Sequence, residues 1–333
     1  MERYFKKYVG IALAVLFLGN TNPTNAPKVI DDVSAPTNIN VKFMASGIHA
    51  NRDLTVLHIG DLYKDRWDTL SQVAFWREVM KLNPESAIVN IASTRKIVGI
   101  VSMNQWKRKS EVEKDLFRDS IRSAYNLSSE ESVFFTSGKS YFYKFKEVVP
   151  DIDKAIPIFE DQGVDPFFAQ CVLLIESPGK LQKSNVGAYG SFQLMKGVAK
   201  NMGLKVNKKV DERKNFERSA WAAAKLFRTV CIPYAKSMLE KRGISYSTND
   251  LWYKLLVLHV YHAGAGNVAP ALDKIALNGG VDSTNAKDLI LKMWQTKCAN
   301  FGNASQNYSQ LALAALVELD HTVYSNCGSL GCR

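Results

Sequence analysis

An apolar segment that ends at one glutamate places the strongest constraint on this chain. Residues 164–179, VDPFFAQCVLLIESPG, begin with Asp165 and Pro166, residue types that are favoured at an N-cap and at the first helical position. The Pro-Gly pair at 178–179 disfavours a continuing helix, so the helix is predicted to end near Glu176. Apolar side chains occupy most of its faces. The sequence therefore predicts a buried, central helix.

Glu176 is predicted to lie in the last turn of this helix. An apolar surrounding and the negative end of the helix dipole both disfavour a carboxylate, so we expect its pKa to be raised. A carboxylic acid with a raised pKa can donate a proton near neutral pH. The alternative is a glutamate that faces solvent at a helix end or pairs with Lys180.

The sequence outside this segment shows two patterns of expected secondary structure. With 333 residues, 46% of them hydrophobic and 23% charged, it is predicted to be globular and long enough for two domains. Strand-like and helical segments alternate before Val148, and helices separated by Gly, Pro and Asn follow it. We predict an α+β protein with a signal peptide or membrane anchor at 1–26, a linker at 27–49, a small α/β domain of unknown role at 50–145, a mainly helical domain at 146–325 and a tail at 326–333.

The first half carries clear periodicities but no group of catalytic residues. We expect helices over 67–83 and 110–127, strands over 54–62, 86–93 and 96–102, and a strand hairpin over 132–145.

Charge and the N-terminus indicate where the chain acts. A net charge of +11 favours an anionic partner, which leaves nucleic acid, a membrane surface and an acidic polymer open. Residues 1–7 are net positive, 8–19 form an apolar run too short for a comfortable membrane span, and small polar residues follow up to Ala26. This pattern predicts an export signal, with an uncleaved anchor as the alternative. Export favours an envelope polymer over nucleic acid as the partner.

The cysteines and histidines do not predict a metal site. The five cysteines have no zinc-binding spacing, and the five histidines include no metallohydrolase motif. Cys327 and Cys332 either close a small loop in an oxidising compartment or remain free thiols. His259 is predicted to be a packed or hydrogen-bonded helix residue.

Four segments in order carry a resemblance to a known family. They are IES at 175–177, SNVGAYGSFQLM at 184–195, VDERKNFERSAWAAAKLF at 210–227 and VYHAGAGNV at 260–268. The chain over about 140–320 resembles the soluble-type lytic transglycosylases, particularly the branch of membrane-bound lytic transglycosylase D. The resemblance implies a lysozyme-like fold for the helical domain and says nothing of the first one.

The resemblance and the residues together suggest a site. Glu176 is implied as the catalytic residue. Gly187 and Gly190 allow a tight turn, and Ser191 is expected to cap a helix that begins at Phe192. The substrate-binding residues that we infer are Ser184, Gly187, Tyr189, Gln193, Met195, Tyr261, His262, Asn267 and Tyr308.

Two of these residues have a plain structural alternative. The amide of Gln193 either reaches a sugar substituent or satisfies the backbone of its own turn. Tyr261 ends an apolar helix, and its hydroxyl either bonds the Glu176 carboxyl or a substrate amide, or is the polar tip of a core aromatic residue.

The chain also departs from the family pattern. His262 replaces an asparagine, and Pro178 stands two residues after Glu176. A later family motif aligns its tyrosine with Tyr308, but its acidic position falls on Ala304. These departures leave a changed specificity or a reduced activity open.

The function implied by the resemblance is cleavage of peptidoglycan. The enzyme would cut the β-1,4 bond between N-acetylmuramic acid and N-acetylglucosamine and leave a 1,6-anhydro ring, with one carboxyl group and no cofactor. It would be exported to the periplasm or cell envelope and act on glycan strands. A goose-type lysozyme-like hydrolase and a non-enzymatic wall-binding scaffold are the alternatives.

Overall fold

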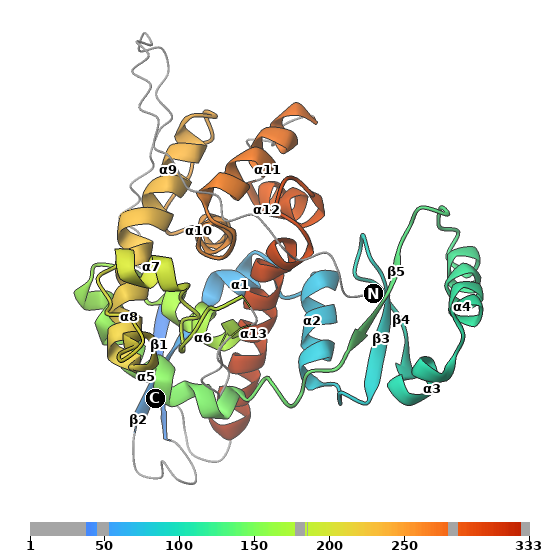
Figure 1. Cartoon of the computed structure of the whole chain (residues 1–333), viewed down its shortest axis with the longest axis horizontal. Helices are drawn as coiled ribbons and strands as arrows, with labels where there is room; N and C mark the ends of the chain where they lie inside the picture. Colours follow the sequence, from blue (N-terminus) through green and yellow to red (C-terminus); the bar gives the residue numbers. More distant parts are fainter. Residues whose placement is uncertain (1–37, 45–52, 177–183, 185, 279–285, 328–333) are drawn as a thin grey trace.

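The structure, a computed structural model, describes residues 38–44, 53–176, 184, 186–278 and 286–327 (Figure 1). The predicted export segment, most of the linker, the residues directly after Glu176 and the Cys327–Cys332 pairing lie outside what it describes. Within the described residues, none of the helices combines the length and the apolar character that a membrane span needs.

Two antiparallel strands open the described chain. β1 (Asn38–Met44) pairs with β2 (Asp53–Ile59), with Asn38 opposite Ile59 and Met44 opposite Asp53. β1 therefore runs through the range that was predicted to be a linker. β2 includes most of the predicted strand over 54–62. The last three residues of that predicted strand instead belong to the short helix α1 (Gly60–Lys64).

Side chains from two helices bind the outer edge of β2. The Gln170 side chain accepts a hydrogen bond from the Leu57 N–H and donates one to the Leu57 carbonyl oxygen, each 2.9 Å long. The Asp153 carboxylate accepts a hydrogen bond of 2.9 Å from the Thr55 N–H. A strand edge otherwise presents unpaired backbone groups. These bonds join β2 to the helical part of the molecule.

Helices form most of the remaining structure, and α13 runs through its middle (Figure 1). The helical half consists of α5 (Phe145–Asp161), α6 (Phe167–Glu176), α7 (Lys196–Asn201), η2 (Glu212–Lys214), α8 (Phe216–Leu226), the π-helical turn η3 (Phe227–Cys231), α9 (Ile232–Glu240), α10 (Leu251–Ala263), α11 (Ala265–Leu277), α12 (Ala286–Gln295) and α13 (Asn303–Cys327). Together with the small sheets this makes the molecule an α+β protein, as predicted.

α6 is buried on every face from Phe167 to Ile175. The Asp165 carboxylate accepts a hydrogen bond of 2.8 Å from the Phe167 N–H, and it also forms an ion pair of 2.7 Å with Lys254. The predicted central helix and the capping role of Asp165 are thus confirmed.

α13 connects the helical half to α2 (Ser71–Lys81) through buried charge. Glu318 is 6% exposed and pairs with Arg77 at 2.6 Å and Lys81 at 2.8 Å, both from α2. Asp320, two residues further along α13, accepts a hydrogen bond of 2.8 Å from the Tyr63 hydroxyl. β2, α1 and α2 therefore share one hydrophobic core with the helical half.

A second sheet with its own small core forms the lobe at the right of Figure 1. Its antiparallel strands lie in the order β4-β3-β5. The lobe contains β3 (Ser86–Ile91), β4 (Ile97–Ser102), α3 (Met103–Arg108), α4 (Glu111–Ala124) and β5 (Val133–Ser137). The range 50–145, predicted as one unit, is thus shared between two groups of packed elements.

The predicted hairpin over 132–145 is wrong in its second half. After β5 the chain leaves the sheet, and the backbone N–H groups of Lys139 and Ser140 donate to the carbonyl oxygens of Val79 and Leu82. Carbonyl oxygens at the end of α2 therefore accept the hydrogen bonds that a second hairpin strand would otherwise accept.

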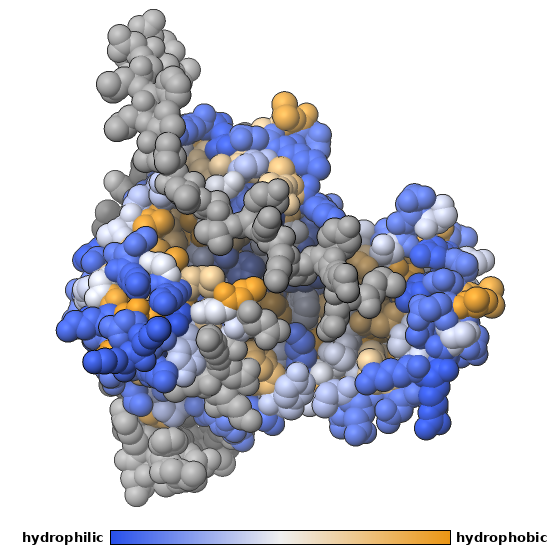
Figure 2. Space-filling view, in the orientation of Figure 1, coloured by the Kyte–Doolittle hydropathy of each residue, from blue (hydrophilic) through white to orange (hydrophobic). Residues whose placement is uncertain are grey.

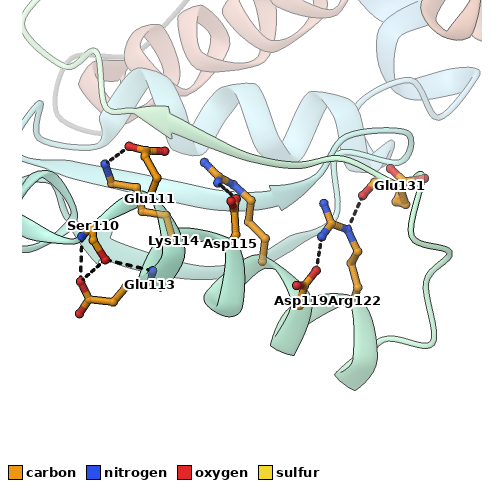
Figure 3. Close-up of polar contacts among 9 residues, drawn as sticks. Ser110, Glu111, Glu113, Lys114, Asp115, Asp119, Arg122 and Glu131 are labelled. Atoms are coloured by element: carbon orange, nitrogen blue, oxygen red, sulfur yellow. Dashed lines mark hydrogen bonds and ion pairs between the residues drawn. The ribbon is translucent and has the colours of Figure 1, made fainter.

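Local polar contacts define α4 (Figure 3). Ser110 and Glu113 form a reciprocal capping box at its first turn. Ion pairs three residues apart then follow one another along the helix, as between Asp115 and Arg118. Contacts of this kind are what the sequence pattern predicts for a solvated helix.

The outer surface is mostly hydrophilic, with scattered hydrophobic residues on the small lobe (Figure 2). Ile100, Val112 and Leu116 are the most exposed of these, at 58%, 69% and 64%. Their side chains belong to β4 and α4.

Replacement of Gln170 by alanine tests whether β2 is part of the helical core. Gln170→Ala leaves the Leu57 N–H and carbonyl without partners in a buried site, so we expect a loss of about 2–5 kcal/mol in the free energy of unfolding. Urea denaturation of the full chain measures it. The matched control is Gln105→Ala, an exposed residue of α3, which is expected to change stability by less than about 0.5 kcal/mol. A loss below about 1 kcal/mol for Gln170→Ala would contradict the role given to this amide.

Candidate active site

Glu176 is the last residue of α6, and the residue as a whole is partly exposed. Burial raises the pKa of this carboxyl group to about 7, while the nearby Tyr308 hydroxyl lowers it in part. The raised pKa predicted from the sequence is therefore confirmed, with burial as its main cause. Near pH 7 such a group exchanges a proton readily in either direction.

Three tyrosines lie near this carboxyl group. Burial raises the pKa of Tyr143, Tyr261 and Tyr308, and the charge of Glu176 raises each of them further. Tyr308 is 2% exposed, and its hydroxyl makes no hydrogen bond of ordinary geometry to any described residue. It is nevertheless close enough to Glu176 for each group to shift the pKa of the other. The Tyr308 hydroxyl can therefore form a hydrogen bond with a ligand or with the Glu176 carboxyl group.

Tyr261 has a different partner from the one considered in the sequence. Its hydroxyl donates a hydrogen bond of 2.6 Å to the Phe192 carbonyl oxygen rather than to Glu176. Its ring stacks on Phe227 with 4.6 Å between the ring centroids and an interplanar angle of 4°. Tyr261 therefore connects the end of α10 to the turn that holds Gln193.

His262 stacks on the other important tyrosine. The rings of His262 and Tyr308 are 4.4 Å apart and inclined by 28°. Burial lowers the pKa of the His262 imidazole to about 4, although the residue keeps an exposed surface. His262 therefore lies beside Tyr308 as a neutral, partly exposed ring at neutral pH.

The glycine-rich segment forms two consecutive tight turns. The Gly187 N–H donates to the Ser184 carbonyl, and the Ser184 hydroxyl accepts a hydrogen bond of 2.9 Å from the Ala188 N–H. Tyr189 and Leu194 then pair as an isolated antiparallel bridge. Both glycines of this segment have left-handed backbone angles, with φ of 92° at Gly187 and 83° at Gly190.

The helix expected to begin at Phe192 is absent, because the bridge closes a turn there and α7 begins only at Lys196. Gln193 lies in this turn with φ of 45°, and its side-chain amide donates a hydrogen bond of 2.9 Å to the Gly190 carbonyl. The amide thus contacts its own turn, which was one of the two roles considered for it.

Arg213 stabilises the turn that contains Gln193. It is 4% exposed, and one of its terminal nitrogens donates to the carbonyl oxygens of Gly187 and Leu194, both at 2.9 Å. Its other nitrogens bind both carboxylate oxygens of Asp211. Charge-assisted, bidentate contacts are among the strongest hydrogen bonds in proteins. Arg213 therefore fixes the segment that carries Gln193.

The remaining inferred residues line the same region less closely. Tyr189 is half-buried under the Arg213 guanidinium, which lies 5.6 Å from its ring centroid. Met195 is 44% exposed at the start of α7. The Asn267 side chain donates to the Ala263 carbonyl in the first turn of α11, and Ala304 is exposed in the first turn of α13.

Among the residues described, no second carboxyl group affects the pKa of Glu176, and no set of His, Cys, Asp and Glu side chains is arranged to hold a metal. His259 is buried, with its Nε2 2.8 Å from the Ser309 hydroxyl, and burial lowers its pKa to about 3. It is a packed, hydrogen-bonded residue, as predicted.

Sequence reasoning missed two residues of this region. Tyr143 lies before α5, far from the family motifs, and no pattern marks it. Arg213 lies inside the DERK segment that supports the resemblance, so its motif was found but its role was not.

A substitution at Gly190 tests the construction of this turn. A Cβ atom at this position would lie 2.0 Å from the Arg213 carbonyl oxygen, and φ is unfavourable for any L-residue. We expect Gly190→Ala to destabilise the protein by about 2 kcal/mol or more in a urea titration. Gly197→Ala, in α7 with open space around it, should be neutral or stabilising by up to about 1 kcal/mol. Equal effects of the two changes would contradict this account.

Comparison with known proteins assigns this region to a family. Residues 158–276 match the family model described as "Transglycosylase SLT domain", and a search of curated proteins found no match to the chain. The matched range contains Glu176, both glycine turns, Arg213 and Tyr261. Tyr308 lies beyond it. The match supports lytic transglycosylase activity on peptidoglycan in general, which suggests the cell envelope as the place of action. Residues 158–276, in the helical half of this chain, are therefore similar to a soluble lytic transglycosylase-type domain.

Proposed function

We propose that the protein is an exported peptidoglycan lytic transglycosylase with Glu176 as its single general acid and base. The observation that carries this proposal is a carboxyl group whose pKa burial raises to about 7, next to the buried hydroxyl of Tyr308, which lowers that pKa in part. The family match supports the general activity. The bond cleaved, the product and the role of each residue are our inference.

The reaction requires one group that first gives and then takes a proton. Protonated Glu176 donates its proton to the oxygen that links N-acetylmuramic acid to the departing N-acetylglucosamine. The N-acetyl group of the muramyl residue stabilises the cationic carbon. The Glu176 carboxylate then removes the proton of the C6 hydroxyl, and that oxygen closes the 1,6-anhydro ring. A pKa near the working pH suits both steps.

No carboxyl group of the described residues is among the causes that shift the pKa of Glu176, which suits a route with a single carboxyl group. Glycosidases of the usual kind use two carboxyl groups, one as acid and the other as base or nucleophile. Here the described neighbours of Glu176 are tyrosines. Tyr308 would bond the reacting carboxyl group or the substrate, whereas Tyr261 would act by positioning the Gln193 turn.

A non-enzymatic wall-binding scaffold is the second candidate. It is motivated by Ala304, where the resembled family has an acid, and by His262, where it has an asparagine. The Glu176 carboxyl group, with a pKa near 7, favours the enzyme over the scaffold, because a protein that only binds the wall does not require a buried acid of this kind.

Digestion of purified peptidoglycan tests the proposal. We expect the full chain to release fragments with 1,6-anhydro ends, as identified by mass spectrometry. Glu176→Gln keeps the shape of the side chain but removes the titrating proton, so we expect turnover to fall by about 10²–10⁴-fold while the fold is retained.

Three outcomes would contradict parts of this reading. Reducing ends in place of anhydro ends would indicate a hydrolase. Binding to insoluble peptidoglycan with no released fragments would favour the scaffold. Wild-type turnover by Glu176→Gln would remove Glu176 from the mechanism.

The pH dependence of turnover provides an independent test. Because the acid must begin protonated, we expect kcat/KM to fall as the pH rises through about 7. The Tyr308 hydroxyl lowers the pKa of Glu176, so Tyr308→Phe should move this fall to higher pH. Stopped digestion assays across pH 5–9 measure the midpoint.

The matched control for this shift is Tyr253→Phe. Tyr253 in α10 also has a buried hydroxyl without a partner among the described residues, but Glu176 is not among the groups that affect its pKa. We expect the midpoint to stay unchanged in this variant. Equal midpoints for Tyr308→Phe and the wild type would exclude contact between Tyr308 and Glu176 in the working enzyme.

A further inference from the structure

A cavity of about 490 Å³ lies between the turn after β3 and the first turns of α13. This volume falls within the range of small-ligand sites. Gln306 and Gln310 of α13 line it, one helical turn apart. Tyr308 lies two residues from each of them and therefore on another face of the same helix, toward Glu176. The cavity is thus separated from the candidate active site by α13.

Arg95 lines this cavity. It is 8% exposed and lies in the turn between β3 and β4 with a left-handed φ of 58°. One terminal nitrogen, Nη2, donates to the Oδ1 atoms of Asn303 at 3.1 Å and Asn307 at 2.9 Å. The guanidinium carbon also lies 5.3 Å from the ring centroid of Phe75. The protein therefore holds a charged group rigidly at the wall of a cavity.

The charge of Arg95 has no ionic partner among the described residues. A guanidinium group has five N–H donors, and the two asparagines occupy only those of Nη2. Burial is the one cause that lowers the pKa of Arg95, and no carboxylate opposes it. The cavity lining also includes two glutamates, Glu130 and Glu131, and the Glu131 carboxylate accepts a hydrogen bond from the Ser93 N–H.

Two further features offset the negative charge of Glu130 and Glu131 at the same place. Lys297 lines the cavity and is exposed at the residue level. α13 begins at Asn303, and its first turn contains no acidic residue, so the positive end of its dipole faces the guanidinium group without compensation. A buried charge without a counter-ion is costly, and an anionic ligand would offset that cost.

We propose that this cavity binds a carboxylate-bearing peptide, with Arg95 as the residue that holds the carboxylate. A planar guanidinium fork matches a planar carboxylate in two parallel hydrogen bonds. The aromatic side chains of Phe134 and Trp294 line the cavity beside polar amides, as suits a short peptide. The inference deepens the proposed function, because the peptides attached to wall glycan strands are ligands of this class.

Binding of a glycan-free peptide to the full chain tests the site. The probe is L-alanyl-γ-D-glutamyl-L-lysyl-D-alanine, with a second form in which both carboxylates are amidated. Calorimetric titration should give a Kd below about 1 mM for the first peptide. The amidated form should bind at least about 10-fold more weakly because it cannot accept the guanidinium fork.

Two variants and a matched control locate the binding. We expect Arg95→Gln to weaken binding at least about 10-fold, and Lys297→Glu about 3- to 10-fold. Lys241→Glu, an equal charge reversal at the exposed end of α9, should leave the Kd unchanged. If Arg95→Gln does not fold, the comparison of Lys297→Glu with Lys241→Glu decides.

The outcomes separate this site from the proposed function. Glu176→Gln should bind the peptide with the wild-type Kd, so binding can be tested even if no peptidoglycan is cleaved. The proposal is overturned if the peptide does not bind at several times 1 mM, if the amidated peptide binds equally well, or if Lys297→Glu and Lys241→Glu have the same effect. Competition by inorganic phosphate at lower concentration than the peptide would also overturn it, in favour of a phosphate site.

Discussion

The burial of α6 on all faces is the constraint on which the candidate site depends. Packing from Phe167 to Ile175 leaves Glu176 as the first residue of this helix to reach solvent, and it does so only in part. A carboxyl group in that position has lost most of its hydration, so its neutral form is favoured. The same packing requires Gln170, in the middle of the helix, to find polar partners, which it does at the edge of β2. The acid and the N-terminal strand therefore depend on one buried helix.

Local signals predicted much of this arrangement. Asp165, Pro166 and the Pro-Gly pair after Glu176 define the ends of α6 within a few residues, and the glycines mark the turns of the site. What lies across space was not predictable in this way. The sequence predicts a helix at Phe192 because Ser191 resembles a cap. The structure has a turn there, and the hydrogen bonds that fix the turn come from Arg213, more than one element away.

The predicted domain boundaries also depend on contacts across space that local sequence patterns do not report. Alternating strand and helix patterns over 50–145 suggested one unit, because periodicity reports which face of an element is apolar and not what it packs against. Ion pairs from Glu318 and hydrogen bonds from Gln170 place β2 and α2 in the core of the helical half. Neither contact has a signature in the sequence, since the partners are separated by more than 100 residues.

α13 relates the candidate active site to the cavity beside Arg95. One face of this helix presents Tyr308 to Glu176, and another presents Gln306 to the cavity. The residue that departs from the resembled family, Ala304, lies in the first turn between Asn303 and these positions. An acid there would offset the positive end of the helix dipole. With alanine, the first turn of α13 contains no acidic residue, and the nearest carboxylates that line the cavity with Arg95 are those of Glu130 and Glu131. Arg95, whose Nη2 is bound by the amide oxygens of Asn303 and Asn307, and the N-terminal turn of α13 therefore lie together at this cavity, and both favour a carboxylate supplied from outside the chain.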